Sequence, residues 1–259
     1  MSTSIINRQV RWKDLTEYSV FETIRELSLP IIWFTAALAA MNFSIIVTAI
    51  CTGYTFLFGL RVAHNSFHRA LGLPAWANNW VMMGISWILI GSAHAIYVTH
   101  LYHHKHCLED EDVEGQLARY PFWRALSLSP LYPFQIHIKA LKICSPSIRR
   151  WIGLELVTSA TLHLVIMPTI FGPNYFIYLS IMAFANLIAP MFGIWLVHRD
   201  CDNPAKQARS CRSTILNFLS GNMLYHHEHH LFPGVPSRKM RELSSRIDLH
   251  AKTSGLMIF

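Results

Sequence analysis

The chain has 259 residues, of which 52% are hydrophobic and only 14% are charged. This charged fraction is well below the quarter or so expected of a soluble globular domain, so the composition excludes an ordinary soluble protein and indicates lipid as the solvent. The formal net charge of +7 does not indicate nucleic acid, because the Lys and Arg residues form no basic helix and no run interleaved with aromatic residues.

The first predicted elements form a membrane hairpin. The segment before them lacks the short apolar core and small-residue cleavage site of a signal peptide, so we expect the first span to direct insertion. From Pro30 to Ala63 the chain is almost purely apolar, with Arg61 as its one charge. This length suits two short helices joined by a tight turn, which we predict at Asn42-Phe43-Ser44.

Two later segments are predicted to lie along the membrane and not across it. Val81 to Ala93 is apolar over only 13 residues, which suits an interfacial or re-entrant helix better than a span. Its two flanks are then expected on one side of the membrane. Tyr120 to Trp151 combines aromatic residues with prolines and basic residues, a pattern typical of a membrane-surface segment.

A second hairpin follows. Ile152 to Phe171 provides 20 residues and Tyr175 to Val197 provides 23 more, with the strong turn signal Gly172-Pro173-Asn174 between them. No Pro-, Ser- or Gly-rich linker divides the chain. We therefore predict an all-α polytopic membrane protein in one domain over 1–259, with four transmembrane helices in two hairpins and a cytoplasmic helical cap that holds a histidine-rich dimetal site.

The basic residues predict the orientation. Neither hairpin turn contains Lys or Arg, so the positive-inside rule places both termini and every long loop in the cytoplasm. The basic residues at the opposite ends are Arg8, Arg11, Lys13, Arg61, Arg69, Lys105, Lys139, Lys142, Arg149, Arg150, Arg199, Lys206, Arg209 and Arg212. The five cysteines are scattered without a C-x-x-C spacing, which suits a reduced protein without a disulfide framework.

Three histidine clusters lie at or just beyond the ends of apolar segments. They are H-x-x-x-H at His64 to His68, H-x-x-H-H at His100 to His104, and H-H-E-H-H at His226 to His230. Residues at i, i+3 and i+4 share one face of a helix, so each cluster aims two or three imidazoles at a common point. His198, one residue beyond the fourth predicted span, is either a ninth candidate or an interfacial histidine with ordinary polar partners.

Nine imidazoles are more than one metal ion uses. A structural zinc takes four ligands, so two ions with four or five nitrogens each is the natural division. Imidazole binds zinc, copper, nickel and iron, so the spacing does not name the metal. The chain contains neither Glu-x-x-His nor H-E-x-x-H, which argues against a carboxylate-bridged di-iron site and a zinc protease. Ordinary polar contacts are expected for His94, His106, His137, His163, His227 and His250.

The order of the boxes resembles the membrane fatty acid desaturase superfamily. The resemblance rests on the three boxes and on the tail N-M-L-Y-H-H-E-H-H-L-F-P-G-V-P from Asn222 to Pro236, and it extends from about Leu29 to Leu249. In that superfamily the boxes bind two irons, a further histidine comes from the end of the fourth span, and an asparagine reaches one iron through water. The resemblance therefore implies an iron enzyme.

Carried over to matching positions, the resemblance implies nine metal ligands, His64, His68, His100, His103, His104, His198, His226, His229 and His230. Asn222, one turn before His226, matches the water-mediated asparagine. The first box has Asn65 where many members carry Asp, so a carboxylate is not implied there. The candidates to orient imidazole N–H groups, each of which can equally be a solvated charge, are Asp110, Asp112, Asp200 and Glu228.

The implied activity is reduction of O2 at two irons, cycling between Fe2+ and Fe3+, coupled to oxidation of a membrane lipid or other long apolar substrate. Such a cycle needs two electrons, yet the chain has no dinucleotide-binding loop, haem motif or iron–sulfur cysteine set. We therefore expect an external donor of the ferredoxin or cytochrome type with its reductase. An acidic donor and anionic headgroups are alternative partners for the basic residues Lys139, Lys142, Arg149 and Arg150.

Three functions stay open at this point. Desaturation of a fatty acyl chain leads, because the second box is H-x-x-H-H where ketolases usually have a wider spacing. The alternative is a hydroxylase or ketolase of a carotenoid, sphingolipid or other apolar chain, since a short chain is common among carotenoid-modifying members. A metal transporter or receptor is less favoured, because transporters bind near the membrane midplane and these histidines lie outside the apolar segments.

Overall fold

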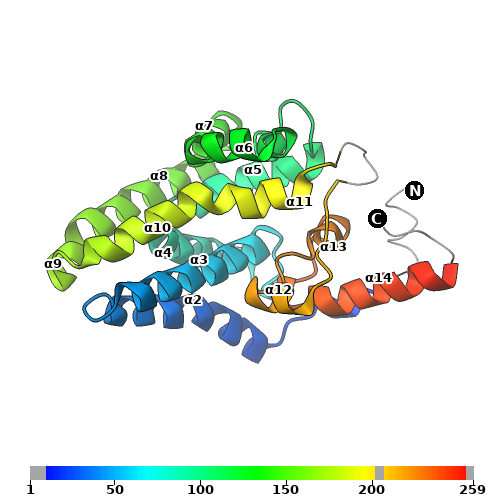
Figure 1. The fold of residues 1–259 in the computed structure, drawn as a ribbon, viewed down its shortest axis with the longest axis horizontal. Helices are drawn as coiled ribbons and strands as arrows, with labels where there is room; N and C mark the ends of the chain where they lie inside the picture. Colours follow the sequence, from blue (N-terminus) through cyan, green and yellow to red (C-terminus); the bar gives the residue numbers. More distant parts are fainter. Residues whose placement is uncertain (1–9, 202–206, 255–259) are drawn as a thin grey trace.

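The computed structural model describes residues 10–201 and 207–254, and over these ranges the chain is helical with one isolated β-bridge (Figure 1). The α-helices are α2 (Val20–Ala40), α3 (Ile45–Phe67), α4 (Ala75–Leu89), α5 (Ala93–His106), α6 (Phe122–Leu128), α7 (Tyr132–Ile143), α8 (Pro146–Thr161), α9 (Met167–Phe171), α10 (Tyr175–Pro190), α11 (Leu196–His198), α12 (Thr214–Leu219), α13 (His226–Leu231) and α14 (Met240–Ser254). π-helical turns join α8 to α9 and α10 to α11. The predicted all-α class is confirmed, while Arg8 and Lys206 lie outside the described residues.

Four helical stretches in the described ranges are long and apolar enough to cross a membrane, which confirms the predicted number. They are Val20–Ala40, Ile45–Phe67, Pro146–Phe171 and Tyr175–His198. The two hairpin turns meet, because Asn174 Nδ2 donates to Asn42 Oδ1 across 2.8 Å. Both turns therefore lie at one end of the bundle, as two hairpins of the same orientation require.

The first hairpin is longer than predicted. α2 begins at Val20 and not at Pro30, because Ser19 and Glu22 form a capping box in which each side chain accepts from the other's backbone N–H. The fully buried Glu26 in the second turn is accommodated by pairing, since it receives the guanidinium of Arg61 at 2.6 Å. Hydropathy alone therefore underestimated the helix.

The short apolar stretch belongs to a sharply bent helix pair. We predicted one helix over Val81 to Ala93, but α4 already begins at Ala75 and ends before Ile90, which has a φ of +62°. α5 then leaves at an angle of 111° to α4. Since the ring nitrogens of His68, after α3, and His100, in α5, lie 3.0 Å apart, the pair starts and ends at the same end of the bundle. This is the arrangement of a re-entrant element.

The remaining helices surround this framework. The main apolar core lies where α3 packs against α2, α4 and α10, and it includes Val62, Leu89, Tyr178 and Met182. α6 and α7 lie across α5 and α10 (Figure 1) and expose several apolar side chains, among them Trp123 at 77%, as a membrane-surface segment would. α12, α13 and α14 gather at the end of the bundle away from the hairpin turns (Figure 1).

Candidate metal centre

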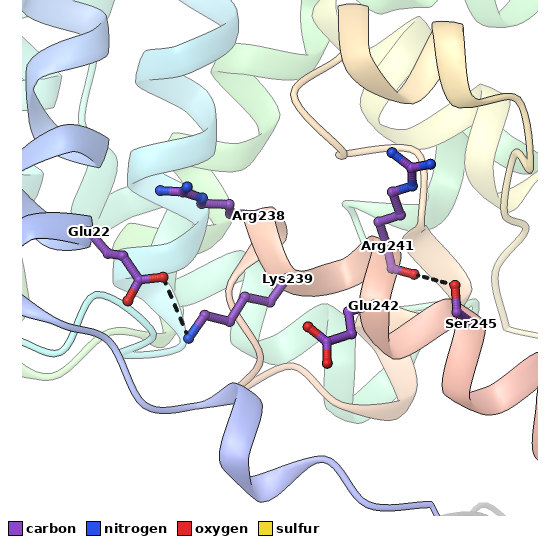
Figure 2. Close-up of a pocket in the computed structure, with 6 residues that line it drawn as sticks. All are labelled: Glu22, Arg238, Lys239, Arg241, Glu242 and Ser245. Atoms are coloured by element: carbon purple, nitrogen blue, oxygen red, sulfur yellow. Dashed lines mark hydrogen bonds and ion pairs between the residues drawn. The ribbon is translucent and has the colours of Figure 1, made fainter.

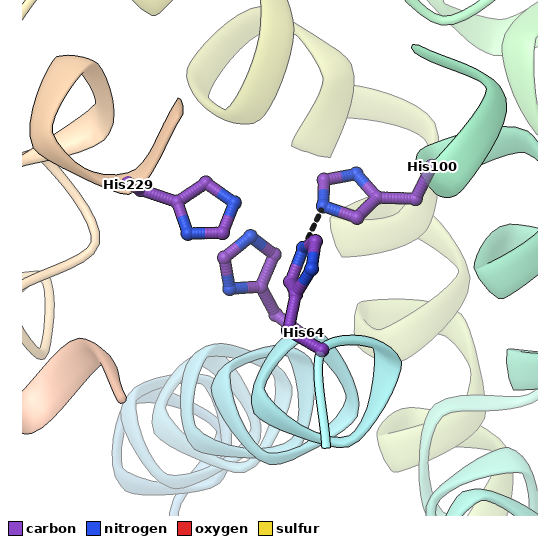
Figure 3. A group of neighbouring side chains, drawn as sticks. His64, His100 and His229 are labelled. Carbon is purple, nitrogen blue, oxygen red and sulfur yellow. Dashed lines mark hydrogen bonds between the residues drawn. The ribbon is translucent and has the colours of Figure 1, made fainter. Parts of the chain in front are cut away.

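The nine predicted ligands converge from four parts of the chain. Figure 3 shows the rings of His64, His100 and His229 facing one another from α3, α5 and α13. With His68 they form a first group whose ligand atoms lie within 4.8 Å of one another. The convergence arises because α3 ends, α5 returns from the bend and α13 starts at the same end of the bundle.

A second group adjoins the first. It contains His103, Cys107, His198 and His230, whose ligand atoms also lie within 4.8 Å of one another. The two remaining predicted ligands join this cage. His226 Nε2 lies 2.9 Å from His198 Nε2, and His104 Nε2 lies 2.9 Å from His229 Nε2 while its ring stacks on His230 at 4.4 Å. All nine imidazoles thus occupy one cluster, and their binding of metal stays a prediction.

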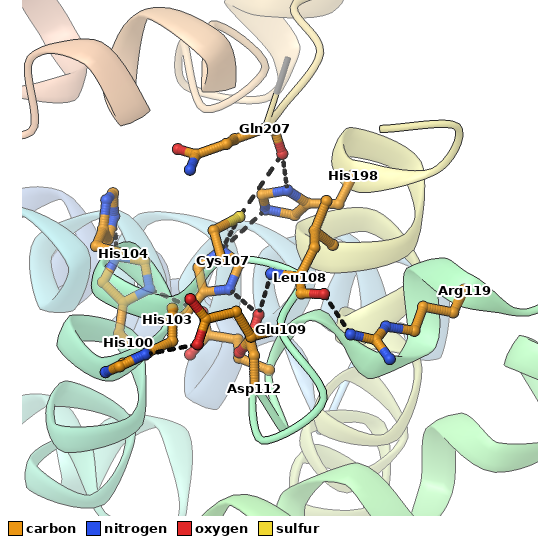
Figure 4. A network of polar contacts seen from close by, with 12 residues as sticks. His100, His103, His104, Cys107, Leu108, Glu109, Asp112, Arg119, His198 and Gln207 are labelled. Carbon is orange, nitrogen blue, oxygen red and sulfur yellow. Dashed lines mark hydrogen bonds and ion pairs between the residues drawn. The ribbon is translucent and has the colours of Figure 1, made fainter. Parts of the chain in front are cut away.

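Three acceptors set the orientation of the imidazoles. The Asp112 carboxylate lies 2.8 Å from His103 Nδ1, and the backbone carbonyl of Gln207 lies 2.7 Å from His198 Nδ1 (Figure 4). Glu114 Oε1 lies 2.7 Å from His100 Nδ1. Each acceptor holds a proton on Nδ1, so the Nε2 lone pair points into the cage, as in carboxylate–histidine–metal arrangements.

The Nε2 lone pairs of the imidazoles require a cation between them. His103 Nε2 faces His198 Nε2 at 3.2 Å, although Nδ1 of both rings is the hydrogen-bond donor. Two acceptors at this distance repel, and a shared metal ion or proton removes the repulsion. In addition, both ring nitrogens of His64 and of His230 are buried without a hydrogen-bond partner in the described ranges. Buried unpaired nitrogens are costly, so this donor set fits metal ions.

The electrostatic environment favours neutral imidazoles at most positions. Burial, reinforced by the surrounding imidazoles, holds the pKa of His226, His229 and His230 well below the usual range, and burial lowers the pKa of His68 to about 4. These rings can bind a cation at neutral pH without releasing a proton. His103 differs. Burial lowers its pKa, but the hydrogen bonds to Asp112 and Cys107 and the negative charges of Glu114 and Asp112 together raise it well above the usual range, so a metal there displaces a proton.

Two of the acids predicted as imidazole partners have other partners. Asp110 pairs with Arg119 at 2.7 Å and its side chain is 98% exposed, while Asp200 pairs with Arg209 at 2.9 Å. Of the two alternatives left open for these residues, the structure favours the solvated charge. Each lies close to a histidine along the chain, but the chain turns its side chain toward solvent and a neighbouring guanidinium. Only the tertiary structure distinguishes these carboxylates from Asp112.

Glu228 takes neither of the two roles left open for it. Its fully buried carboxylate accepts hydrogen bonds from Ser210 Oγ and from Arg212, whose guanidinium also reaches Asp248 of α14 at 2.9 Å. Glu228 therefore fastens α13 to the preceding loop and to α14. It positions the third box through the backbone and not through an imidazole N–H.

Two residues of the site were missed from the sequence. Glu114 holds His100, yet it lies 14 positions further along the chain and no spacing rule connects them. Cys107 Sγ lies 3.8 Å from His103 Nε2. It could have been found, because H-x-x-H-H-x-x-C continues the same helical face by one turn.

Two asparagines connect the boxes to the rest of the chain. Asn222, whose φ is +65°, donates from Nδ2 to the carbonyl of Arg238 at 3.3 Å, so its water-mediated metal contact stays a prediction. Asn65 Oδ1 accepts from both the backbone N–H and the hydroxyl of Ser237 at 3.0 Å. Asn65 thus ties the first box to the segment that follows the third.

One surface depression lies away from the histidines. It has a volume of about 490 Å3 and opens where the start of α14 faces α2 (Figure 2). Its lining is Glu22, Arg238, Lys239, Arg241, Glu242 and Ser245, with Lys239 Nζ 3.7 Å from Glu22 Oε1. None of the nine histidines lines it, and its charged walls do not suit an apolar ligand. The histidine cage is therefore the candidate functional site.

Comparison with known proteins agrees with this site. The model of the family described as "Fatty acid desaturase" matches residues 36–258. A beta-carotene ketolase from Paracoccus sp. (strain N81106 / MBIC 01143) is 30% identical over 223 residues, which covers 79% of this chain and 81% of the ketolase. The range of the family model includes all three boxes and His198, so the resemblance first seen in the boxes is confirmed.

Proposed function

The chain belongs to the fatty acid desaturase family, and from this membership we propose that it binds two irons and uses O2 to oxidise a C–H bond of a long apolar lipid. An oxidoreductase of this superfamily is what the family match and the ketolase homologue support. The observation that carries the proposal is the convergence of nine imidazoles at one end of an apolar four-span bundle. Their ring nitrogens face one another, and both nitrogens of His64 and of His230 lack a hydrogen-bond partner in the described ranges.

Unactivated C–H bonds resist every protein side chain, and two bound irons would supply the oxidant by reducing O2. The residues of the chain hold and orient this centre. Asp112 and Glu114 keep a proton on Nδ1 of His103 and His100, so that Nε2 of each ring is free for metal. The burial of the cage excludes water, which protects a strong oxidant from side reactions.

For the product we propose desaturation of a fatty acyl chain. The compact H-x-x-H-H spacing of the second box supports this choice. The reaction removes one hydrogen from each of two adjacent methylenes and forms a carbon–carbon double bond. One O2, two electrons and two protons are consumed with the two substrate hydrogens, and two waters are released.

A second candidate is ketolation of a carotenoid or a similar apolar molecule, which the 30% identity to a beta-carotene ketolase favours. Conversion of one methylene to a carbonyl proceeds through two oxygenations. It consumes two O2, four electrons and four protons and releases three waters. The metal-binding cage can be the same for both reactions, because the outcome depends on where the substrate carbon lies relative to the metals.

Mass spectrometry of cell extracts tests both candidates. The chain and its His229→Ala variant are expressed separately in a host that makes fatty acids and β-carotene. Desaturation lowers an acyl mass by two units, whereas ketolation raises the carotenoid mass by fourteen and hydroxylation raises it by sixteen. Unchanged lipids and carotenoids in iron-replete cells, with a donor and reductase supplied, would contradict the proposed function.

We further propose that a ferredoxin- or cytochrome-type donor supplies the electrons from the cytoplasmic side. Lys139 and Lys142 of α7 supply positive charge close to the cage, since Lys139 Nζ lies 4.5 Å above the ring of Tyr102 within the second box. An acidic donor bound there would be near α5. Replacing Lys142 with Glu should raise the KM for the donor at low salt and leave the bound metal unchanged.

A further inference from the structure

The bend between α4 and α5 breaks a helix inside the span bundle. A broken helix leaves backbone carbonyls at one end and N–H groups at the other without intrahelical partners. In hydrocarbon no water can satisfy them, and each unsatisfied group costs several kcal/mol. The partners of residues 86–95 therefore reveal what holds the bend.

Four consecutive carbonyls at the end of α4 each accept a hydrogen bond from a different side chain of the third and fourth spans. The pairs are Ser159 Oγ to Ser86 O at 3.3 Å, His163 Nε2 to Trp87 O, Tyr178 Oη to Ile88 O at 2.9 Å and Asn186 Nδ2 to Leu89 O at 2.8 Å. The hydroxyl of Tyr175 donates a hydrogen bond to His163 Nδ1, so Nε2 of this ring carries the proton and donates to the Trp87 carbonyl. The end of α4 is thus capped from outside, while Ser86 O also keeps the intrahelical bond from the Ile90 N–H.

The start of α5 is satisfied in the same way. Its first three N–H groups reach Ser86 Oγ at 2.8 Å, Glu155 Oε2 at 3.1 Å and Ser92 Oγ at 3.0 Å, donated by Ala93, His94 and Ala95 respectively. Of these acceptors, Glu155 alone belongs to a span, namely α8. It connects the start of α5 to the third span.

Glu155 makes two further contacts at this point. It accepts from the Ser92 hydroxyl at 2.5 Å and lies 2.6 Å from His94 Nδ1, while the His94 ring stacks on Trp151 at 5.0 Å. The Glu155 side chain is fully buried. An ionisable residue in a span is expensive and normally has a function, yet Glu155 is remote from the metal ligands in sequence and is not one of them.

The position of α5 decides where the second box points. His94 precedes His100 by six residues, or about 9 Å along a helix. The far end of α5 is held by Glu114 and Asp112 through His100 and His103. Glu155 holds the start of α5. The helix that carries the second box is therefore held at both ends.

We propose that Glu155 is a positioning residue for the metal centre, which holds the N-terminus of α5 so that His100, His103 and His104 point at the ions. This inference rests on the proposed function. It assigns a role to the one acidic side chain of the third span, whose Oε2 accepts from the Ser92 hydroxyl and from the His94 N–H at the bend.

The test measures metal binding and its spectrum, without any substrate. The purified full-length protein is loaded with Co2+, and the d–d absorption and the dissociation constant are recorded for wild type, Glu155→Leu and Glu155→Gln. We expect Glu155→Leu to weaken binding by about 10- to 100-fold and to alter the spectrum, as loss of an orienting partner does. Glu155→Gln keeps a side-chain oxygen for Ser92 and His94 N, so it should restore most of the affinity.

The matched control is Thr161→Val on the same span, because Thr161 bonds only to its own helix at Val157 in the described contacts. It should behave as wild type. If Glu155→Leu does not fold, Ser92→Ala replaces it, since this change removes the hydroxyl that binds Glu155 and should shift the spectrum in the same direction. A folded Glu155→Leu or Ser92→Ala protein with wild-type affinity and spectrum would overturn the inference. Failure of the wild type to bind two ions would instead overturn the proposed function.

Discussion

The buried Arg61–Glu26 pair offers a quantitative test of how the first hairpin is held. Arg61 Nε and Nη2 donate to the two carboxylate oxygens of Glu26 at 2.6 and 2.8 Å, and both side chains are buried. Arg61 Nη1 also reaches the carbonyl of Gly221 at 3.3 Å. The pair therefore links α2 and α3 to the segment just before the third box.

The perturbation is Arg61→Leu, which leaves the Glu26 carboxylate buried without its cation. Removing one partner of a buried pair costs about 3–5 kcal/mol, because the remaining charge has lost its compensation. For a chain of this size about 1 kcal/mol shifts the unfolding midpoint by roughly 2–4 °C, so we expect a decrease of roughly 6–20 °C. The double variant Glu26→Leu/Arg61→Leu should recover most of this loss, since neither charge remains.

The assay is thermal unfolding in detergent, followed by tryptophan fluorescence at one fixed scan rate for all variants. Arg25→Leu is the control, because Arg25 lies on α2 beside Glu26 but is exposed. It should shift the midpoint by no more than a few degrees. If Arg61→Leu were no less stable than Arg25→Leu, or if the double variant lost as much as the sum of both single variants, the pair would not hold the hairpin.

Three further experiments test the centre and the topology. His103→Ala should abolish turnover and lower the bound iron below two per chain while leaving membrane insertion intact. Retained activity would mean that His103 is not a metal ligand. Glu114→Gln should weaken metal binding by about 10- to 100-fold because His100 loses its carboxylate partner, and an unchanged iron content under chelator challenge would contradict this. In a variant without native cysteines, Pro173→Cys should be labelled from outside the cell and Glu111→Cys should not, and the reverse pattern would disprove the predicted orientation.

Local patterns determined most of the architecture. Apolar runs and turn residues predicted four spans in two hairpins, because lipid demands long apolar helices and leaves a clear signal in composition. The spacing of the boxes predicted which imidazoles would share a helix face, and all nine lie in one cluster. The same spacing carried the family resemblance, which the match over residues 36–258 confirms.

Contacts between residues far apart in the sequence could not be predicted from these local patterns. The start of α2 has a local signal in the Ser19–Glu22 capping box, but the charge of Glu26 argues against a helix there until Glu26 meets Arg61 on another helix. The break at Ile90 depends on donors from two later spans. Hydropathy treats each charge or polar group as a cost, because it cannot know which partner will satisfy it. The helix boundaries that were wrong are those at which such partners exist.

The tertiary structure alone decided which acids serve the imidazoles. Asp110 and Asp112 are two residues apart, yet Asp110 faces solvent and Arg119 while Asp112 holds His103. Glu114 and Glu155 carried no spacing signal, since a carboxylate can contact an imidazole or a helix N-terminus from any distance along the chain. Helix periodicity places ligands on a common face, but only the packing of separate helices brings each carboxylate to the group that it orients.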